Sequence, residues 1–304
     1  MTRKPEVDAL GASLLIGFSV LLGLNQALVK VVNAGFSPVF QGGLRSALAL
    51  PLVLAFALLM KRKLSVTDGS LPWGTLNGVL FCLEFGFLFV ALDYTTVARV
   101  SLFFYVMPVW VAIGAHFLIP EEPINRNKLA GLGLAIAGIA IALASDLGDA
   151  PPNAWIGDLF ALVGGFFWAC IALLTRIKLS ATSSEMNLLY QLSISAVVLT
   201  LLAPFLGPII REPTLLIYAV FTFQVVVVVA VGFVAWFWLL SIYPVSNMAS
   251  FGLLAPIFGV LFGWLMFGDD LTGGFILAMI TVGGGIVLVN KPVNRTPKDE
   301  QSSG

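Results

Sequence analysis

Two ionisable side chains, Glu84 and Arg45, lie inside long apolar segments of this sequence. An ionisable group inside a membrane span costs roughly 2.5–3.5 kcal/mol on insertion scales, so it is a functional hypothesis by default. The Glu84 carboxylate could bind a substrate ammonium group or act in proton coupling. The Arg45 guanidinium could bind a substrate carboxylate. The structural alternatives are a tie between helices for Glu84 and pairing with backbone carbonyls or a neighbouring polar group for Arg45.

Aromatic and amide side chains at mid-span depth extend this set of candidate substrate-binding residues. Tyr105, Trp168, Phe233 and Trp236 could form a wall for a flat apolar substrate, and Asn25 could contribute an amide. Ordinary packing or lipid contact is the alternative for each aromatic residue. The other amides in or near apolar runs either link helices or face a pathway: Gln26, Gln41, Asn77, Gln191 and Gln224.

Two prolines are candidate hinges, because Pro108 and Pro256 occupy matching places in two apolar runs. Each removes a backbone hydrogen bond and loosens its helix. Arg99 lies near Asp93 in the sequence, and we expect an ion pair between them at the outer interface.

No constellation in the sequence predicts catalysis or a metal. The two cysteines, Cys82 and Cys170, lie in apolar runs, and His116 is the single histidine. An intramembrane enzyme would need a nucleophile–base pair or a metal cluster in its spans, and a nucleotide-driven pump would need a phosphate-binding loop. The sequence has none of these, so we expect no catalytic residue, no metal and no cofactor.

Composition places the chain in a lipid bilayer. Hydrophobic residues make up 59% of it and charged residues 11%, with a mean hydropathy of +1.00. A soluble domain carries about a quarter charged residues, so this chain could not cover its surface in water. The net charge of zero gives no electrostatic footprint for nucleic acid. We interpret the first apolar run as a spanning helix rather than a signal peptide.

Ten apolar runs are long enough to cross a membrane, which takes about 20 residues. They lie near residues 9–31, 36–60, 71–92, 97–119, 129–145, 155–175, 187–206, 215–240, 247–267 and 273–290. Cytoplasmic loops are enriched in Lys and Arg. Most basic residues, including Lys61-Arg62-Lys63, share one side if both termini are cytoplasmic, and an even number of spans satisfies that orientation.

The two halves of the sequence repeat each other at an offset of about 146 to 148 residues. In this alignment Met107-Pro108-Val109 meets Ala255-Pro256-Ile257, and Glu121-Glu122 meets Asp269-Asp270. Arg45 meets Gln191, and Glu84 meets Gly232. We therefore expect a first five-helix repeat at 8–146, a second at 152–291 and a cytoplasmic tail at 292–304. Five spans is an odd number, so the second repeat must insert upside down. Inverted repeats are typical of transporters that work by alternating access.

The sequence resembles the drug/metabolite transporter superfamily in its EamA-type ten-helix branch. The resemblance rests on Gly-Leu-Arg-Ser-Ala-Leu (43–48), Ala-Leu-Asp-Tyr-Thr-Thr-Val-Ala (91–98), Pro108 followed by Glu121-Glu122-Pro123, and the glycine-rich last helix of each half. It implies export or exchange of amino acids and similar metabolites without a bound nucleotide, and the YddG-type aromatic amino acid exporters are one such branch. Family members often carry a tryptophan late in helix 1, where this chain has Leu22. The corresponding position in the second half is a tryptophan, Trp168.

These observations predict an all-α, multi-pass secondary transporter of a bacterial inner membrane. Its expected substrate is a small metabolite, most simply an amino acid, and its expected state is a monomer or homodimer. A channel for small solutes is the main alternative, because a channel could carry the same repeat. An intramembrane enzyme is the alternative from another class.

Overall fold

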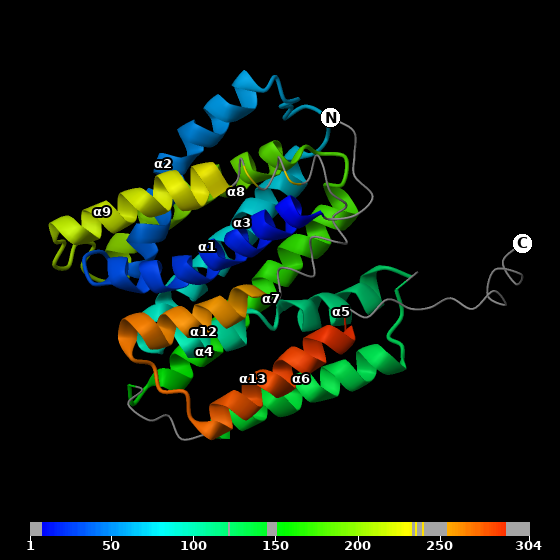
Figure 1. Cartoon of the computed structure of the whole chain (residues 1–304). Coiled ribbons are helices and arrows are strands. Elements are labelled where there is room, and N and C mark those ends of the chain that lie inside the picture. Colours follow the sequence, from blue (N-terminus) through cyan, green and yellow to red (C-terminus); the bar gives the residue numbers. More distant parts are fainter. Residues whose placement is uncertain are drawn as a thin grey trace, which may run out of the picture.

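The computed structural model describes residues 8–120, 122–144, 151–232, 235, 239 and 254–289. These residues form helices and connecting turns, with one isolated antiparallel bridge between Phe36 and Ile210 (Figure 1). Seven helical spans are long and apolar enough to cross a membrane, and three further apolar helices are shorter. Many of their large apolar side chains are exposed, which the hydrocarbon of a bilayer accommodates.

Four of the six helices in the first half of the described chain begin at a side-chain cap. Asp8 accepts a hydrogen bond from the Gly11 amide at 2.9 Å, and the Thr96 hydroxyl accepts one from the Arg99 amide at 3.2 Å. Such caps satisfy amides that have no partner within the helix. The helices are α1 (Ala9–Asn33), α2 (Pro38–Leu59), α3 (Leu71–Tyr94), α4 (Val97–Phe104), α5 (Met107–Leu118) and α6 (Arg126–Ala144).

The second half contains two long helices and several shorter ones. The segments are α7 (Ala154–Lys178), α8 (Ser184–Leu202), the 3₁₀ turn η1 (Ala203–Phe205), α9 (Leu215–Phe223), the π-helix η2 (Gln224–Val231), α12 (Leu254–Phe267) and α13 (Gly273–Val289). The span expected at 215–240 is thus described as α9 followed by η2. Residues 240–253, which include the start of the span expected at 247–267, lie outside the described residues.

The span expected at 97–119 crosses as one apolar segment from Val97 to Leu118, but it is divided into two helices. The division falls at Tyr105 and Val106. Its physical cause is Pro108, which has no N–H to donate to the carbonyl of Phe104 one turn earlier. The sequence predicted a loosened helix here, and the structure has two.

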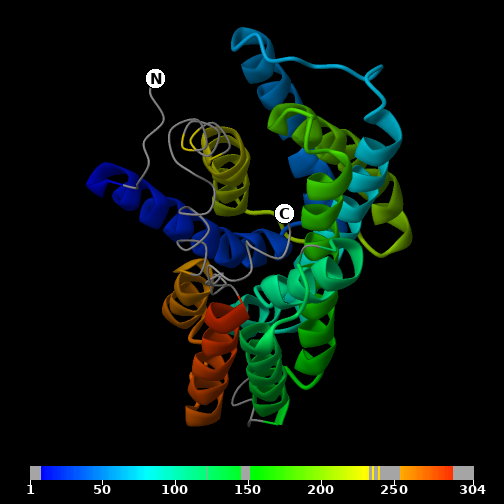
Figure 2. The ribbon, with the colours of Figure 1, turned by 90° about the vertical axis from the view of Figure 1, so that its right-hand side faces the viewer.

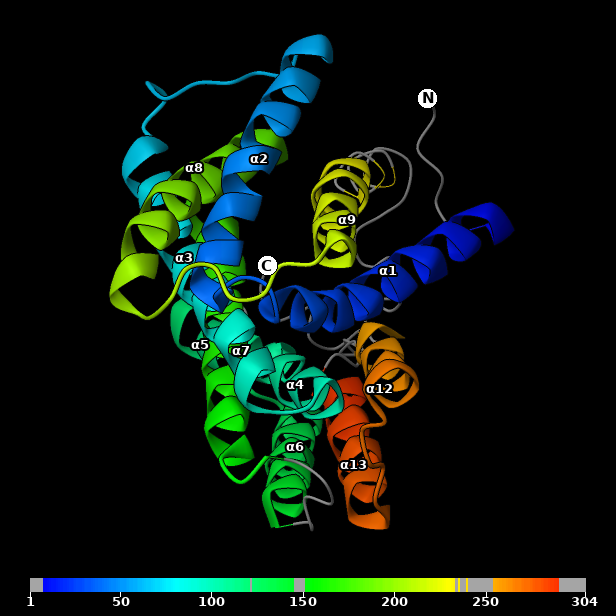
Figure 3. The same cartoon turned by 90° about the vertical axis from the view of Figure 1, so that its left-hand side faces the viewer.

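Four helix pairs form the most extensive packing within the described residues: α6 with α13, α3 with α7, α2 with α8, and α1 with α12. Figures 2 and 3 show α6 beside α13 at one end of the molecule and α2 beside α8 at the other. The α6–α13 seam is close because a Cβ added to Gly285 would lie 2.6 Å from the carbonyl oxygen of Gly131. Across the α2–α8 seam, the Ser46 and Ser195 hydroxyls lie 2.8 Å apart.

The packing follows the alignment of the two halves. In that alignment α2 corresponds to α8 and α6 to α13, so these two seams join corresponding helices. Two further sets of contacts have counterparts. α7 packs against α4 and α5, and its counterpart α1 packs against α12. α3 packs against α7, and the corresponding segments, α9 with η2 and α1, also make contact, less extensively. These parts of the two halves therefore use equivalent surfaces.

Candidate functional site

Arg45 on α2 and Glu84 on α3 both lie in the interior of the bundle, and each is only 5% exposed. The guanidinium lies over two rings of α3, with 4.5 Å to the Phe85 centroid and 4.7 Å to that of Phe89. Arg45 and Glu84 interact electrostatically. Neither side chain forms a hydrogen bond or an ion pair with the residues that the structure describes. The Arg45 and Glu84 side chains therefore both have unused hydrogen-bonding capacity.

An aromatic group adjoins this pair. The Trp168 ring of α7 stacks on Phe104 at 5.0 Å between centroids and meets Tyr105 edge-on at 5.7 Å. Tyr105 in turn interacts electrostatically with Glu84. The structure thus brings together four of the sequence-predicted residues, Arg45, Glu84, Tyr105 and Trp168, from α2, α3, the α4–α5 break and α7.

Close helix packing positions the Trp168 ring. A Cβ added to Gly165 would lie 2.6 Å from the Phe104 carbonyl oxygen, so a side chain at this position would push α7 away from α4. Gly164 faces α3 and α4 in the same way, because a Cβ added there would lie 3.4 Å from the Glu84 carbonyl oxygen. These two glycines let α7 approach, and Trp168, one turn later, reaches the break between α4 and α5.

The two hinge candidates, Pro108 and Pro256, differ in how much of their surroundings the structure describes. Pro108 is the second residue of α5, directly after the break at Tyr105 and Val106. Broken helices at mid-membrane depth expose backbone carbonyls and recur at substrate sites of transporters. Pro256 lies in the first turn of described α12, and the residues that precede Leu254 lie outside the described part.

Asn25 faces a different helix. Its Oδ1 atom accepts from Nε2 of Gln224, the first residue of η2, at 3.5 Å. Gln224 is fully buried, and its own amide oxygen has no partner among the described residues. Phe233 and Trp236, the other two predicted wall residues, lie outside the described residues.

The expected ion pair between Asp93 and Arg99 is wrong. Asp93 binds Arg211 at 2.7 and 2.8 Å, which raises the pKa of that guanidinium. Arg99 instead donates to both carboxylate oxygens of Asp158 on α7, each at 3.0 Å from Nε. The turn at Thr95 folds α4 back against α7, so Arg99 points away from Asp93, and Asp158 also accepts from the Thr95 hydroxyl at 3.1 Å.

Sequence reasoning missed a second carboxylate at the α3–α4 turn. Asp269, between α12 and α13, accepts a hydrogen bond from the Ala98 amide at 2.8 Å, at the start of α4. Burial raises the pKa of Asp269, and the Ala98 hydrogen bond and nearby Lys30 oppose that rise. The Lys30 ammonium of α1 donates to the Thr95 carbonyl. The acidic pair Asp269-Asp270, which the repeat matched to Glu121-Glu122, was the available signal, but it did not identify a partner.

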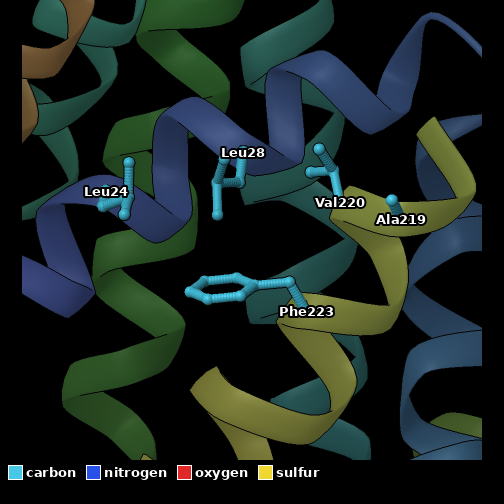
Figure 4. A pocket seen from close by; sticks show the side chains of 5 residues that line it. All are labelled: Leu24, Leu28, Ala219, Val220 and Phe223. Carbon is cyan, nitrogen blue, oxygen red and sulfur yellow. The ribbon is translucent and has the colours of Figure 1, made fainter. Parts of the chain in front are cut away.

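An apolar groove lies between α1 and α9, with a volume of about 340 Å³. Figure 4 shows its lining: Leu24, Leu28, Ala219, Val220 and Phe223. These side chains have no polar atom, so the groove cannot orient a charged ligand. It is distinct in chemistry from the Arg45–Glu84 site.

Curated relatives align along nearly the whole chain. An uncharacterized transporter, YoaV of Bacillus subtilis, is 23% identical over 90% of this chain and 94% of its own. A probable amino-acid metabolite efflux pump of Escherichia coli is 24% identical over 95% of both chains. An uncharacterized transporter of Archaeoglobus fulgidus is 26% identical over 83% of this chain and 87% of its own.

The fold also recurs in a solved structure. A crystal structure described only as that of a protein aligns with a TM-score of 0.63 at 20% identity, over 91% of this chain and 97% of its own. The model of the EamA-like transporter family matches twice, at residues 9–144 and 155–291. The two matches cover most of the sequence and reproduce its division into halves. This chain therefore belongs to the EamA-like transporter family and is a multi-pass protein of the bacterial inner membrane.

Proposed function

We propose that this protein is a secondary transporter that exports or exchanges amino acids by alternating access. Membership of a transporter family supports transport, and a relative named a probable amino-acid metabolite efflux pump supports this substrate class. Family and relatives alike point away from an enzyme. The remaining choice is between a carrier and a channel, which only kinetics can separate.

The observation that carries the substrate class is the buried pair Arg45 and Glu84. Leaving a guanidinium and a carboxylate buried without hydrogen bonds is costly, and a bound ligand that pairs with both would offset that cost. An amino acid offers the matching groups: its carboxylate suits Arg45 and its ammonium suits Glu84. In the absence of a ligand, the Phe85 and Phe89 rings stabilise the Arg45 guanidinium through cation–π contacts.

The aromatic group favours a flat apolar side chain on the substrate. Phe104, Tyr105 and Trp168 present two ring orientations next to Glu84, and aromatic pairs gain about 0.5–1.5 kcal/mol beyond burial. Phe233 and Trp236 belong to the same proposed wall, and Asn25 to its polar side. Aromatic amino acids are therefore the first substrates to test.

Alternating access would follow from the two repeats at 8–146 and 152–291, followed by a tail at 292–304. In this proposal the halves are inverted, both termini are cytoplasmic, and one bundle rocks against the other around the central site. The equivalent packing of the two halves supports it. Pro108 and Pro256 would be the hinges. The protein would work as a monomer or homodimer.

The test is counterflow in proteoliposomes. Vesicles preloaded with an unlabelled amino acid should accumulate the labelled one, because a carrier exchanges its substrate and a channel does not. Glu84→Gln and Arg45→Gln should each abolish counterflow. We expect phenylalanine, tyrosine and tryptophan among the substrates.

The matched controls are Arg62→Gln and Glu185→Gln. Each removes an ion pair outside this site, in which Arg62 Nε lies 2.9 Å from Glu185 Oε1. Both controls should retain counterflow. Unchanged counterflow in Glu84→Gln would refute its role. Failure of the wild-type protein to exchange any amino acid would refute the substrate class, and uptake that never saturates would favour a channel.

A further inference from the structure

Gln41 on α2 is a fully buried glutamine whose amide oxygen has no partner among the described residues. Its Nε2 atom donates to Asn33 Oδ1 at 2.7 Å and to the Val29 carbonyl at 3.3 Å, both on α1. An unsatisfied acceptor in a buried position carries a free-energy cost, so its presence calls for an explanation.

A chain of hydrogen bonds fixes which end of the amide is free. The Phe89 carbonyl can only accept, so the Asn33 group that meets it at 3.0 Å must be the NH₂ end. The Asn33 oxygen therefore faces Gln41 and can only accept, so Gln41 must donate to it from its own NH₂ group. Both amide donors of Gln41 are used in these contacts. Its oxygen is consequently left without a donor.

This free acceptor lies on the same face of α2 as Arg45. Residues four apart on a helix are neighbours, and Phe89, which anchors the Asn33 chain through its carbonyl, also carries its ring 4.7 Å from the Arg45 guanidinium carbon. Arg45 has N–H donors that could satisfy Gln41, but it forms no hydrogen bond with any described residue. The site thus presents a fixed acceptor beside a cation.

We propose that the Gln41 amide oxygen accepts a hydrogen bond from the substrate's α-ammonium group and makes the site selective for α-amino over α-keto acids. The inference rests on the proposed amino acid transport. Arg45 binds the carboxylate, and the ammonium divides its three N–H groups between Glu84 on α3 and Gln41 on α2. A keto acid can bind Arg45 through its carboxylate but has no N–H donor for either Glu84 or Gln41, so Gln41 adds to the selectivity that Glu84 provides. Sites built to hydrogen-bond a substrate group reject the analogue that lacks it.

The experiment measures inhibition of counterflow by matched pairs: phenylalanine with phenylpyruvate, and leucine with its α-keto analogue. In the wild type, each keto acid should inhibit at least about a hundredfold more weakly than its amino acid, because it loses the contacts with both Glu84 and Gln41, each worth roughly tenfold or more. Gln41→Met keeps the side-chain length and removes the acceptor. It should raise KM for the amino acid and leave kcat and keto acid inhibition nearly unchanged. The preference should therefore shrink by roughly the factor that one hydrogen bond to a charged group provides, about tenfold, while Glu84 maintains the rest.

Two further variants make the result decisive. Gln41→Leu also removes the acceptor, with a shorter apolar side chain, and should reduce the preference as Gln41→Met does. Gln26→Met removes a buried glutamine of α1 whose oxygen already accepts from Ser101, and it should behave as the wild type. Melting temperatures of the purified variants separate misfolding from lost selectivity.

The outcomes distinguish the inference from the proposed function. A folded Gln41→Met protein with the full wild-type preference overturns the role of Gln41 but leaves amino acid transport standing. If Gln41→Met does not fold, a full wild-type preference in folded Gln41→Leu overturns the inference instead. A wild type that exchanges no amino acid overturns both.

Discussion

Buried charge in this protein occurs in two chemical states. Arg99 and Asp158 are fully matched, with several hydrogen bonds between a guanidinium and a carboxylate that are 5% and 0% exposed. Arg45 and Glu84 are equally buried but share no hydrogen bond. The first arrangement is a structural tie, because nothing remains for a ligand to bind. The second retains its binding capacity, which is why we assign transport to it.

The tie should be costly to break. Asp158→Asn should lower the free energy of unfolding by about 3–5 kcal/mol, because it leaves the Arg99 guanidinium buried without its counter-ion. Arg211→Gln removes the partly exposed pair with Asp93 and should cost about 1 kcal/mol or less. Unfolding in detergent micelles would measure both. Equal losses in the two variants would contradict this difference in burial.

The sequence revealed the unpaired charges more readily than the paired ones. Glu84 and Arg45 stand out because they interrupt apolar runs, which is a one-dimensional signal. The partner of Arg99 could not be found in this way, because Asp158 is 59 residues distant and the turn at Thr95 decides the direction of the side chain. Likewise, the free oxygen of Gln41 depends on contacts with α1 that no spacing encodes.

Glycine placement determines how closely the helices pack. On α13, Gly285 faces the α6 backbone, whereas an added Cβ at Gly283 would meet nothing within 4 Å. Gly285→Ala should therefore force α6 and α13 apart and cost about 1–3 kcal/mol of stability. Gly283→Ala should be neutral or stabilise by about 1 kcal/mol or less, because alanine favours helix. Thermal melting of the two variants would test this, and the reverse order would disprove the seam.

The break between α4 and α5 allows a separate test of the hinge. Pro108→Ala restores an N–H for the Phe104 carbonyl, so the helix can continue and stiffen. We expect kcat for counterflow to fall several-fold with little change in KM, because the step affected is conformational. Pro51→Ala, which changes a proline inside α2 on an exposed face, is the matched control and should leave kcat unaltered. A wild-type kcat in Pro108→Ala would rule out this hinge.

Hydropathy and length predicted where helices lie but not their internal form. The spans from 9 to 94 and from 154 to 205 match because a polar break ends each one. No polar break marks the division at Tyr105 or the π-helix from Gln224 to Val231. Pro108 indicated a weakened helix near the division, whereas the run of valines gives no indication of the π-helix.

At the scale of the whole molecule, orientation rests on the distribution of Lys and Arg. We expect a cysteine at Lys63 and one at Ser303 to react with an impermeant thiol reagent from the cytoplasmic face, and one at Asn153 from the opposite face. The parent protein for this labelling would carry replacements of Cys82 and Cys170. Labelling of positions 63 and 303 from opposite faces would contradict an even number of spans.

The repeat was visible in the sequence because corresponding residues keep a nearly constant offset. Its packing was not visible. Nothing in the alignment of Ser46 with the second half predicted that its hydroxyl would meet Ser195, a residue of the corresponding helix. Contacts between equivalent helices depend on the relative placement of two bundles, which the order of residues along one chain does not encode.

The two seams between corresponding helices have a consequence for the origin of the site. A single five-helix half could meet a second copy of itself through the same seams, as a symmetric dimer does. Symmetry would then duplicate every residue, so the dimer would carry two copies of Arg45 and two copies of Glu84. Joining the copies in one chain allows Gln191 and Gly232 to stand at the matching positions. Covalent fusion thereby permits a single positive and a single negative group, the arrangement that a zwitterion requires.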